Sequence, residues 1–178
     1  MKKQNNRETL SWQVVPTWLG ELLIICSEKG LLRITLPGWQ GPVEKLIETW
    51  YPESKPLQDS QILMKAVSQL SAYFEGHLQQ FDLPLDLRVT PFQEKVLDQV
   101  RQVPFGSTKT YGDIAKSIGD SNASRAVGMA NNRNPLPIVI PCHRIVGSGG
   151  KLVGYAGGLE GKRRLLAFEQ KVSGKIMI

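Results

Sequence analysis

Residues 138–144 combine residue types that could carry out nucleophilic chemistry. An apolar run, predicted to be a strand, ends at Pro141 and is followed at once by Cys142, His143 and Arg144. The thiolate is the reactive form of cysteine, and nearby positive charge lowers its pKa. Cys142 is therefore the candidate nucleophile, His143 its base and Arg144 a source of positive potential. Because adjacent residues of a strand point to opposite faces, the backbone must bend here or a water must bridge the two side chains.

A third side chain should orient the imidazole, as in other sites with an activated nucleophile. Glu169 is the candidate, because it lies at the edge of the apolar face of a helix predicted over residues 159–170. A carboxylate in that position needs a partner. The alternative is an ordinary surface glutamate in the last helical turn, and the residues alone favour that alternative.

The remaining cysteine and histidine give little support to other chemistries. Cys26 lies in an apolar segment and is interpreted as a small buried hydrophobic residue. The two cysteines are more than a hundred residues apart, so no disulfide framework is predicted. Together with His77 and His143 they show no metal-ligand spacing, and no metal or other cofactor is predicted. A zinc deaminase would need a second cysteine at position 145, which is Ile. A thiol hydrolase, with a distant His and an Asn or Asp, is not excluded by the residues.

The excess positive charge lies in the second half of the chain. Residues 1–90 carry nine Lys or Arg and ten Asp or Glu, a net charge of −1, whereas residues 91–178 carry thirteen and six, a net charge of +7. A polyanion such as DNA would therefore bind the second half, although a solvated basic surface is the simpler alternative. The polar start and the lack of an apolar run of about 20 residues predict a cytoplasmic protein with no membrane contact.

The first half is predicted to be α+β. Strands are expected at residues 11–15, 21–27 and 31–36, the last two forming a hairpin through a turn at 28–30. Helices are expected over 42–50 and over 60–74, where one face is apolar. Residues 79–88 are predicted to contain a strand and then a linker. All four tryptophans lie in this half and are assigned to packing.

The second half is predicted to be helical. Thr90-Pro91-Phe92-Gln93 has the cap, the first-turn proline and the capping box of a helix start, and apolar spacing continues to Val103. Thr110, with Asp113, caps a second helix. Ser121 or Asn122 opens a third, which covers 123–132 and stops at Asn134-Pro135. The last two helices and the glycine-containing turn between them form a helix-turn-helix pattern.

The third of these helices is poor in large side chains. Its small residues are Ala123, Ala126, Gly128 and Ala130, with Arg125 and Arg133 away from the alanine stripe. Such a helix can approach another surface closely. Close packing against another helix is the alternative that composition leaves open.

Several motifs taken together identify a family. Pro141-Cys142-His143-Arg144, with Arg125-Ala126-Val127-Gly128 and Asn134-Pro135 upstream, resembles the methylated-DNA–protein-cysteine methyltransferases (O6-alkylguanine-DNA alkyltransferases). The match runs from Thr90 through Pro104-x-Gly106, Thr110-Tyr111 and Gly154-Tyr155-Ala156-Gly157-Gly158 to Leu165-Leu166-x-x-Glu169. It covers the second half, whereas the first half matches only in length and α+β character.

The resemblance implies both a fold and an activity. The fold is α+β: an N-terminal α/β, ribonuclease H-like domain with antiparallel strands at residues 1–85, and a C-terminal helical, winged-helix-like DNA-binding domain at residues 86–178. The activity is direct-reversal repair, in which an alkyl group passes from O6-alkylguanine, and from O4-alkylthymine, in double-stranded DNA irreversibly to Cys142. The damaged base must first leave the stack. Each molecule reacts once, because no residue is present to cleave the thioether. The reaction needs no cofactor and no obligate protein partner.

The same resemblance implies catalytic roles. Cys142 is the alkyl acceptor, His143 the base that deprotonates it through a water, and Glu169 the residue that holds His143. Asn134 braces the turn of the active site. Tyr111 protonates the departing guanine and crowds the neighbouring phosphate.

DNA-binding and pocket residues follow in the same way. Arg125 enters the base stack when the damaged nucleotide rotates out. The helix docks in the minor groove through Ala123, Ala126, Gly128 and Ala130, together with Tyr111. The base pocket is lined by Pro137, Ile145, Tyr155 and Ala156, the last of which replaces a serine found in some members.

Two further family properties are tested by the residues present. The zinc bound by the first domain of some members is not expected, because Cys26 and His77 are too few ligands. Non-catalytic, lesion-binding relatives lack the acceptor cysteine, so Cys142 argues against that alternative.

Overall fold

The first half of the chain folds around a small sheet with a helix on each face. The computed structural model describes residues 8–52, 54–56 and 60–174. The strands are β1 (Thr9–Thr17), β2 (Gly20–Ser27), β3 (Leu31–Thr35) and β4 (Lys55–Pro56), in the order β3-β2-β1-β4. β2 pairs antiparallel with both β1 and β3, whereas β4 pairs parallel with β1. The predicted strands and the hairpin turn are confirmed.

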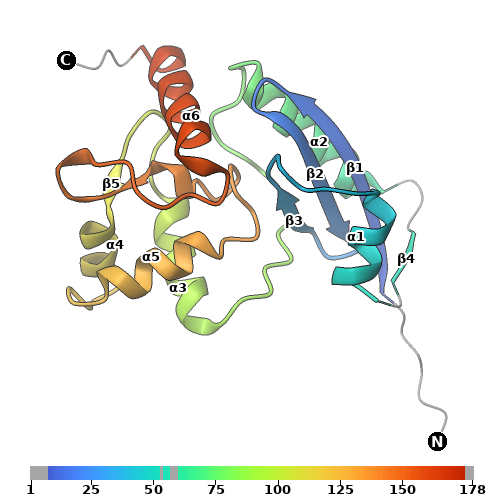
Figure 1. Cartoon of the computed structure of the whole chain (residues 1–178), viewed down its shortest axis with the longest axis horizontal. Coiled ribbons are helices and arrows are strands. Elements are labelled where there is room, and N and C mark those ends of the chain that lie inside the picture. Colours follow the sequence, from blue (N-terminus) through green and yellow to red (C-terminus); the bar gives the residue numbers. More distant parts are fainter. Residues whose placement is uncertain (1–7, 53, 57–59, 175–178) are drawn as a thin grey trace, which may run out of the picture.

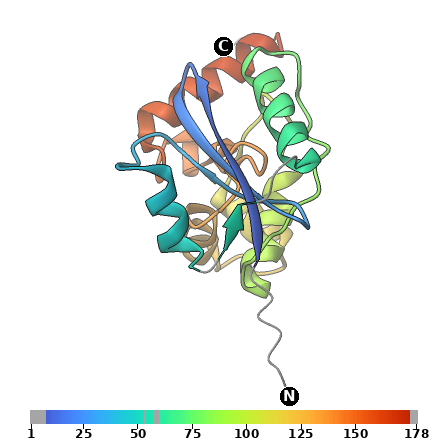
Figure 2. The same cartoon turned by 90° about the vertical axis from the view of Figure 1, so that its right-hand side faces the viewer.

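Alternation along β2 explains why the sheet needs both helices. Leu23 and Ile25 face a small apolar cluster that includes Ile47 of α1 (Val43–Trp50). The residues that alternate with them in β2 face the larger cluster, which includes Leu70 of α2 (Gln61–Phe74). Figure 2 shows α1 in cyan and α2 in green on opposite sides of the strands. The four tryptophans pack against these clusters, as expected.

The two halves share one hydrophobic core. The larger cluster contains Ile24 and Leu70 from the first half and Val96 and Leu165 from the second. The backbone also crosses between the halves, since Ile34 N–H donates to the carbonyl of residue 135 at 2.9 Å. Tyr73 of α2 and Phe168 of α6, two helices labelled in Figure 1, contact each other across this boundary with ring centroids 5.8 Å apart. The first half therefore packs firmly on the second.

Residues 79–88 are irregular, so the predicted strand there is wrong. Only Leu85 pairs in this segment, through a single parallel bridge with Leu31. Asp86 N–H donates to the Leu31 carbonyl at 2.9 Å, and Leu31 N–H donates to the carbonyl of Pro84 at 2.8 Å. A longer ladder cannot form because Pro84 has no N–H to donate.

The second half consists of short helices. They are α3 (Pro91–Arg101), α4 (Tyr111–Ser117), α5 (Ser124–Asn132) and α6 (Gly158–Val172), with two 3₁₀ helices, η1 (Cys142–Arg144) and η2 (Ser148–Gly150). β5 (Lys109–Thr110) and β6 (Ile145–Val146) form a parallel pair. α4 and α5 are the predicted helix-turn-helix, and with the sheet of the first half they confirm an α+β fold.

Local signals fixed most helix starts. Thr90 and Thr110 both form the predicted capping boxes. The cap expected at Ser121 or Asn122 is wrong, because α5 begins after Ala123 without a side-chain cap. The Asp120 carboxylate instead accepts from Asn122 N–H at 3.0 Å, which makes a tight turn before the helix.

The segment before Cys142 is a turn and not the predicted strand. Ile138 has φ 77°, and Ile140 N–H donates to the Leu136 carbonyl at 2.8 Å. Pro137 and Pro141 fix φ and lack N–H groups, so the chain cannot pair as a central strand. The apolar residues here are buried because they line the inside of a folded turn.

Candidate active site and DNA-binding face

The η1 turn carries three consecutive buried side chains. Cys142, His143 and Arg144 are 4, 0 and 5% exposed, and Cys142 N–H donates to the Ile140 carbonyl at 2.8 Å. This turn supplies the backbone bend that a thiol–imidazole pairing requires. Among the described residues, Nδ1 of His143 has no hydrogen-bond partner, so the thiol and the imidazole are not bonded directly.

Glu169 of α6 is the centre of a buried polar network. Its side chain is fully buried, so the alternative of a surface glutamate is wrong. Its carboxylate accepts from His143 Nε2 at 2.8 Å, Tyr73 Oη at 2.8 Å and Gly106 N–H at 3.0 Å. Arg144 donates to it through Nε and Nη2, both at 2.9 Å. Segments from both halves therefore converge on one carboxylate.

The protonation states follow from this network. Burial alone raises the pKa of Glu169, but hydrogen bonds and charge from His143 and Arg144 outweigh it and bring the pKa to about 2. An ionised carboxylate only accepts hydrogen bonds, so Nε2 of His143 carries the proton. Burial lowers the pKa of His143, although the hydrogen bond to Glu169 and its negative charge raise it. His143 is thus neutral at rest, with Nδ1 free to accept a proton.

The Cys142 thiol is protonated at rest. Burial raises its pKa to about 11, although a hydrogen bond from Asn134 and the charge of Lys162 oppose the rise. Nearby positive charge does lower this pKa, as expected, but burial outweighs it. Arg144 is already paired with Glu169, and Lys162 is the cation that acts on the thiol.

Lys162 was not identified from the sequence. It lies on α6, is fully buried, and donates through Nζ to the carbonyls of Ile145 at 2.6 Å and Val153 at 2.9 Å. Burial lowers its pKa to about 8, while the Cys142 charge works in the opposite direction. The signal was its spacing of seven residues from Glu169, which places both on the buried face of one helix.

Two asparagines hold the turn that carries Cys142. Asn134 Nδ2 donates to the Ile140 carbonyl at 2.8 Å, and its Oδ1 accepts from Leu136 N–H at 3.0 Å. Asn131, at the end of α5, donates to the Cys142 carbonyl at 3.2 Å. The sequence could not single out Asn131, because a second asparagine follows it. In the structure Asn131 is buried, whereas Asn132 is exposed.

Two tyrosines lie near the thiol. The half-buried Tyr111 begins α4, and its hydroxyl donates to the Val153 carbonyl at 3.2 Å. A Cβ built on Gly128 would lie 3.8 Å from the Tyr111 ring, so Gly128 packs closely against it. The ring of Tyr155 is half-buried but its hydroxyl is buried, and burial followed by the Cys142 charge raises its pKa well above 10.

The other predicted pocket residues differ in exposure. Pro137 and Ile145 are buried, whereas Ala156 is exposed. The Ile145 carbonyl is held by Lys162, which fixes the backbone directly after η1. Ile145 and Ala156 lie in the segment between η1 and α6, whereas Pro137 lies before η1.

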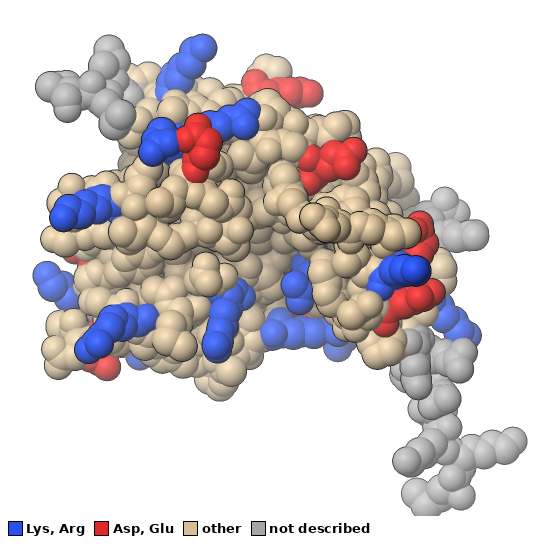
Figure 3. Space-filling model, viewed as in Figure 1, with Lys and Arg blue, Asp and Glu red and all other residues tan. Residues whose placement is uncertain are grey.

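The small residues of α5 differ in exposure. Arg125, Ala126 and Met129 are exposed, whereas Ala123 is half-buried and Ala130 is 3% exposed. Ala130 packs mostly inward, although it lines a small surface hollow together with Ala126 and Met129. In Figure 3, Lys and Arg side chains lie along the lower part of the molecule, over α3, α4 and α5. The basic second half thus presents its charge beside the helix-turn-helix.

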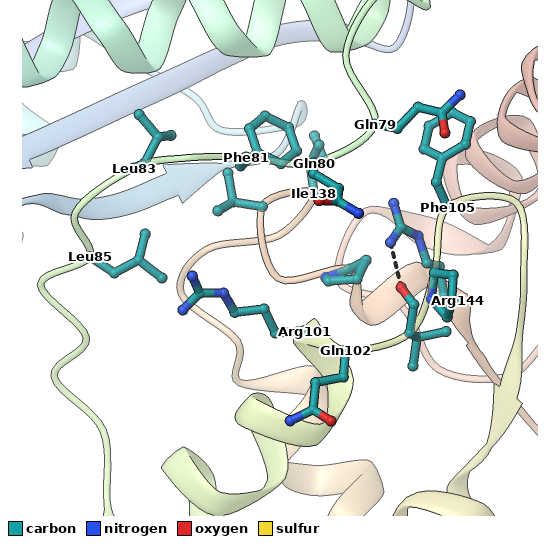
Figure 4. Close-up of a pocket in the computed structure, with 14 residues that line it drawn as sticks. Gln79, Gln80, Phe81, Leu83, Leu85, Arg101, Gln102, Phe105, Ile138 and Arg144 are labelled. Carbon is teal, nitrogen blue, oxygen red and sulfur yellow. Dashed lines mark hydrogen bonds between the residues drawn. The ribbon is translucent and has the colours of Figure 1, made fainter.

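A cavity of about 450 Å³ lies behind the active-site turn. It is bounded by residues 79–85 on one side and by the end of α3 on the other (Figure 4). Pro141 and Arg144 line it, but Cys142 and His143 do not. Arg144 donates from this wall to the Val103 carbonyl at 2.7 Å. The cavity is therefore separate from the reactive sulfur.

Within the described ranges, no helix is long and apolar enough to cross a membrane. The same residues contain no group of three or more His, Cys, Asp or Glu side chains placed to hold a metal ion.

Both halves of the chain match known protein families. Residues 91–171 match the DNA-binding domain of 6-O-methylguanine DNA methyltransferase, and residues 10–87 match its ribonuclease-like domain. The methylated-DNA–protein-cysteine methyltransferase of Methanosarcina acetivorans is 42% identical over 151 residues, which cover 85% of this chain and 92% of the relative. The protein of the same name from Methanosarcina mazei is 46% identical over 159 residues, covering 89% and 96%.

Solved structures agree over both halves. The crystal structure of the Mycobacterium tuberculosis O6-methylguanine methyltransferase has a TM-score of 0.77 and 37% identity, covering 91% of this chain and 93% of that one. The M. tuberculosis OGT in complex with DNA has the same TM-score and identity, covering 92% and 94%.

Proposed function

The chain belongs to the 6-O-methylguanine DNA methyltransferase family and repairs alkylated DNA by direct reversal, and from this premise we propose that Cys142 is the alkyl acceptor. One observation carries the assignment. Cys142 and His143 share the η1 turn, and Glu169 fixes the imidazole with Nδ1 free to accept a proton. Cys26 has no such neighbour, and burial raises its pKa to about 12.

The reaction begins with deprotonation of the thiol. Nδ1 of His143 takes the proton from Cys142 through a bridging water, and Glu169 stabilises the imidazolium that forms. Because burial raises the thiol pKa to about 11, a base is needed to remove the proton. Lys162 stabilises the negative charge that develops on sulfur.

Transfer then exchanges one bond for another. The sulfur attacks the alkyl carbon, the carbon–oxygen bond breaks, and its electron pair stays on guanine. Tyr111 protonates the departing base, and the proton held by the imidazolium then restores the Tyr111 hydroxyl through solvent. Burial raises the pKa of Tyr111, so its hydroxyl is protonated and able to donate. The products are S-alkylcysteine and unmodified guanine, and each molecule reacts once.

DNA binding uses the exposed face of α5 in the minor groove. Arg125 and Ala126 are exposed there, and we assign to Arg125 the role of entering the stack when the damaged base rotates out. Ala123, Gly128 and Ala130 allow close approach, although Ala130 is only 3% exposed. Asn134 braces the turn.

The remaining assignments extend the same proposal. Pro137, Ile145, Tyr155 and Ala156 line the base pocket, and O4-alkylthymine is a second substrate. The domains divide between residues 85 and 86. The protein acts in the cytoplasm, with no membrane contact and no obligate protein partner.

The decisive experiment weighs the protein after reaction with a methylated duplex. The mass should rise by one methyl group, which peptide mapping should place on Cys142. Cys142→Ser should abolish the increase while duplex binding persists, and Cys26→Ser should react normally. Label on Cys26, or repeated release of free alkyl product as a hydrolase would give, would overturn the assignment.

A further inference from the structure

Tyr73 brings the first half of the chain into the active site. It lies on α2, is fully buried, and donates its hydroxyl to Oε1 of Glu169 at 2.8 Å across 96 positions of sequence. Burial and then the Glu169 charge raise its pKa well above 10, so the hydroxyl is a permanent donor. No step of the reaction proposed above uses this residue.

Aromatic contacts from both halves fix the Tyr73 ring. Phe74 and Phe81 contact it from the first half, with ring centroids at 5.3 and 5.6 Å. Phe105 and Phe168 contact it from the second half, at 6.0 and 5.8 Å. Phe81 and Phe105 also border the cavity behind the site (Figure 4). A ring held on several sides directs its hydroxyl at one point.

The oxygen that Tyr73 contacts is the one that holds the catalytic imidazole. Oε1 of Glu169 accepts from both Tyr73 Oη and His143 Nε2, each at 2.8 Å. The carboxylate does not need Tyr73 to be satisfied, because Arg144, Gly106 and His143 already donate to it. A further donor on the same oxygen makes it a weaker acceptor for the imidazole proton.

We propose that Tyr73 is a positioning residue for alkyl transfer, which fixes the Glu169 carboxylate and limits how strongly its Oε1 draws the His143 proton. This inference rests on the proposed function of the site. Without Tyr73, Oε1 binds the imidazolium more tightly, and His143 stays protonated at higher pH. A protonated His143 cannot accept the thiol proton, so the first half of the chain contributes directly to the state of the base.

Tyr73→Phe tests the proposal because it keeps the ring and removes only the oxygen. The matched control is Tyr51→Phe, which removes a hydroxyl that accepts from Arg33 Nε at 3.1 Å on the other side of the sheet. At a pH below the point where the rate falls, transfer from a pre-bound methylated duplex should slow about tenfold in Tyr73→Phe for each pKa unit that His143 gains, because the neutral base becomes tenfold scarcer. The pH below which the rate falls should move upward. Tyr51→Phe should match the unmodified protein in both.

A second readout needs no DNA and separates this proposal from the proposed function. The chain has two histidines, and His77 is exposed, so the imidazole resonances in NMR can be assigned. The His143 Nε2 proton should move to lower field in Tyr73→Phe, because its acceptor becomes stronger. Incorporating 3-fluorotyrosine at position 73, which makes the hydroxyl a stronger donor, should move it the opposite way and does not depend on Tyr73→Phe folding.

An unchanged chemical shift of the His143 Nε2 proton in these proteins would show that Tyr73 has only a packing role, whatever the transfer rate is. A slower reaction with an unshifted pH profile would count against the proposal in the same way. Failure of Cys142 to accept a methyl group would instead refute the proposed function and leave the NMR result standing.

Discussion

Replacing Glu169 with glutamine removes the one negative charge in a fully buried network. Arg144 and Gly106 N–H can only donate, so an amide nitrogen cannot replace a carboxylate oxygen beside them, and Arg144, 5% exposed, would lose its counter-charge. Removing one partner of a buried ion pair typically costs about 3–5 kcal/mol. We therefore expect Glu169→Gln to be strongly destabilising as well as inactive.

The pKa of Glu169 gives an independent magnitude. It falls from the ordinary 4.5 to about 2, and each pKa unit corresponds to about 1.4 kcal/mol, so the ionised carboxylate stabilises the fold by about 3 kcal/mol. Because the folded pKa is depressed, this contribution is fully present above pH 4.5 and is lost as the pH falls toward 2. The stability difference between the two proteins should therefore narrow over that interval.

Urea unfolding near neutral pH and near pH 3 measures this directly. At neutral pH the variant should be about 3–5 kcal/mol less stable, or roughly 6–20 °C lower in Tm for a chain of this size. The control is Glu160→Gln, an exposed residue of α6 paired with Arg163, which should change stability by less than about 1 kcal/mol. A gap that stays equally large near pH 3, or a control that loses as much, would refute the reasoning.

Three further predictions concern the reaction and the DNA. Lys162→Met should slow methyl transfer by about tenfold for each pKa unit that it adds to Cys142, measured by single-turnover assay, whereas Lys171→Met on the exposed last turn should not. Arg125→Ala should slow repair of duplex far more than transfer from free O6-methylguanine, because only the duplex must be unstacked, and Arg163→Ala should affect neither. Equal losses on both substrates would remove that role. Affinity for undamaged duplex should fall log-linearly with salt, and a flat response would contradict phosphate binding by the basic half.

Elements defined by local chemistry could be predicted from the sequence. The capping boxes at Thr90 and Thr110 use side chains within three residues of the backbone groups that they satisfy, so sequence alone fixed both helix starts. The strands of the first half followed from apolar content and turn residues. Cys142 and His143 stood out because a thiol and an imidazole are adjacent in an otherwise apolar segment.

Features that depend on distant contacts could not be predicted in this way. The segment before Cys142 has the composition of a strand, but its prolines and the Asn134 hydrogen bonds fold it into a turn. The residues alone favoured a surface position for Glu169, because nothing local shows that Arg144 and Tyr73 will reach it. Ala130 belonged to a stripe of small residues, yet packing of α5 turns it inward.

Burial of the thiol explains both why the relay is needed and why the reaction goes one way. The surroundings that raise the Cys142 pKa to about 11 penalise a negative sulfur, so attack requires a base at hand and a cation nearby. In the proposed mechanism, His143 and Lys162 supply these for the short time in which charge develops. The product is an uncharged thioether, which an apolar site favours over a thiolate. Alkylation thus relieves the electrostatic cost of the reactive state, and the reverse step would have to restore it.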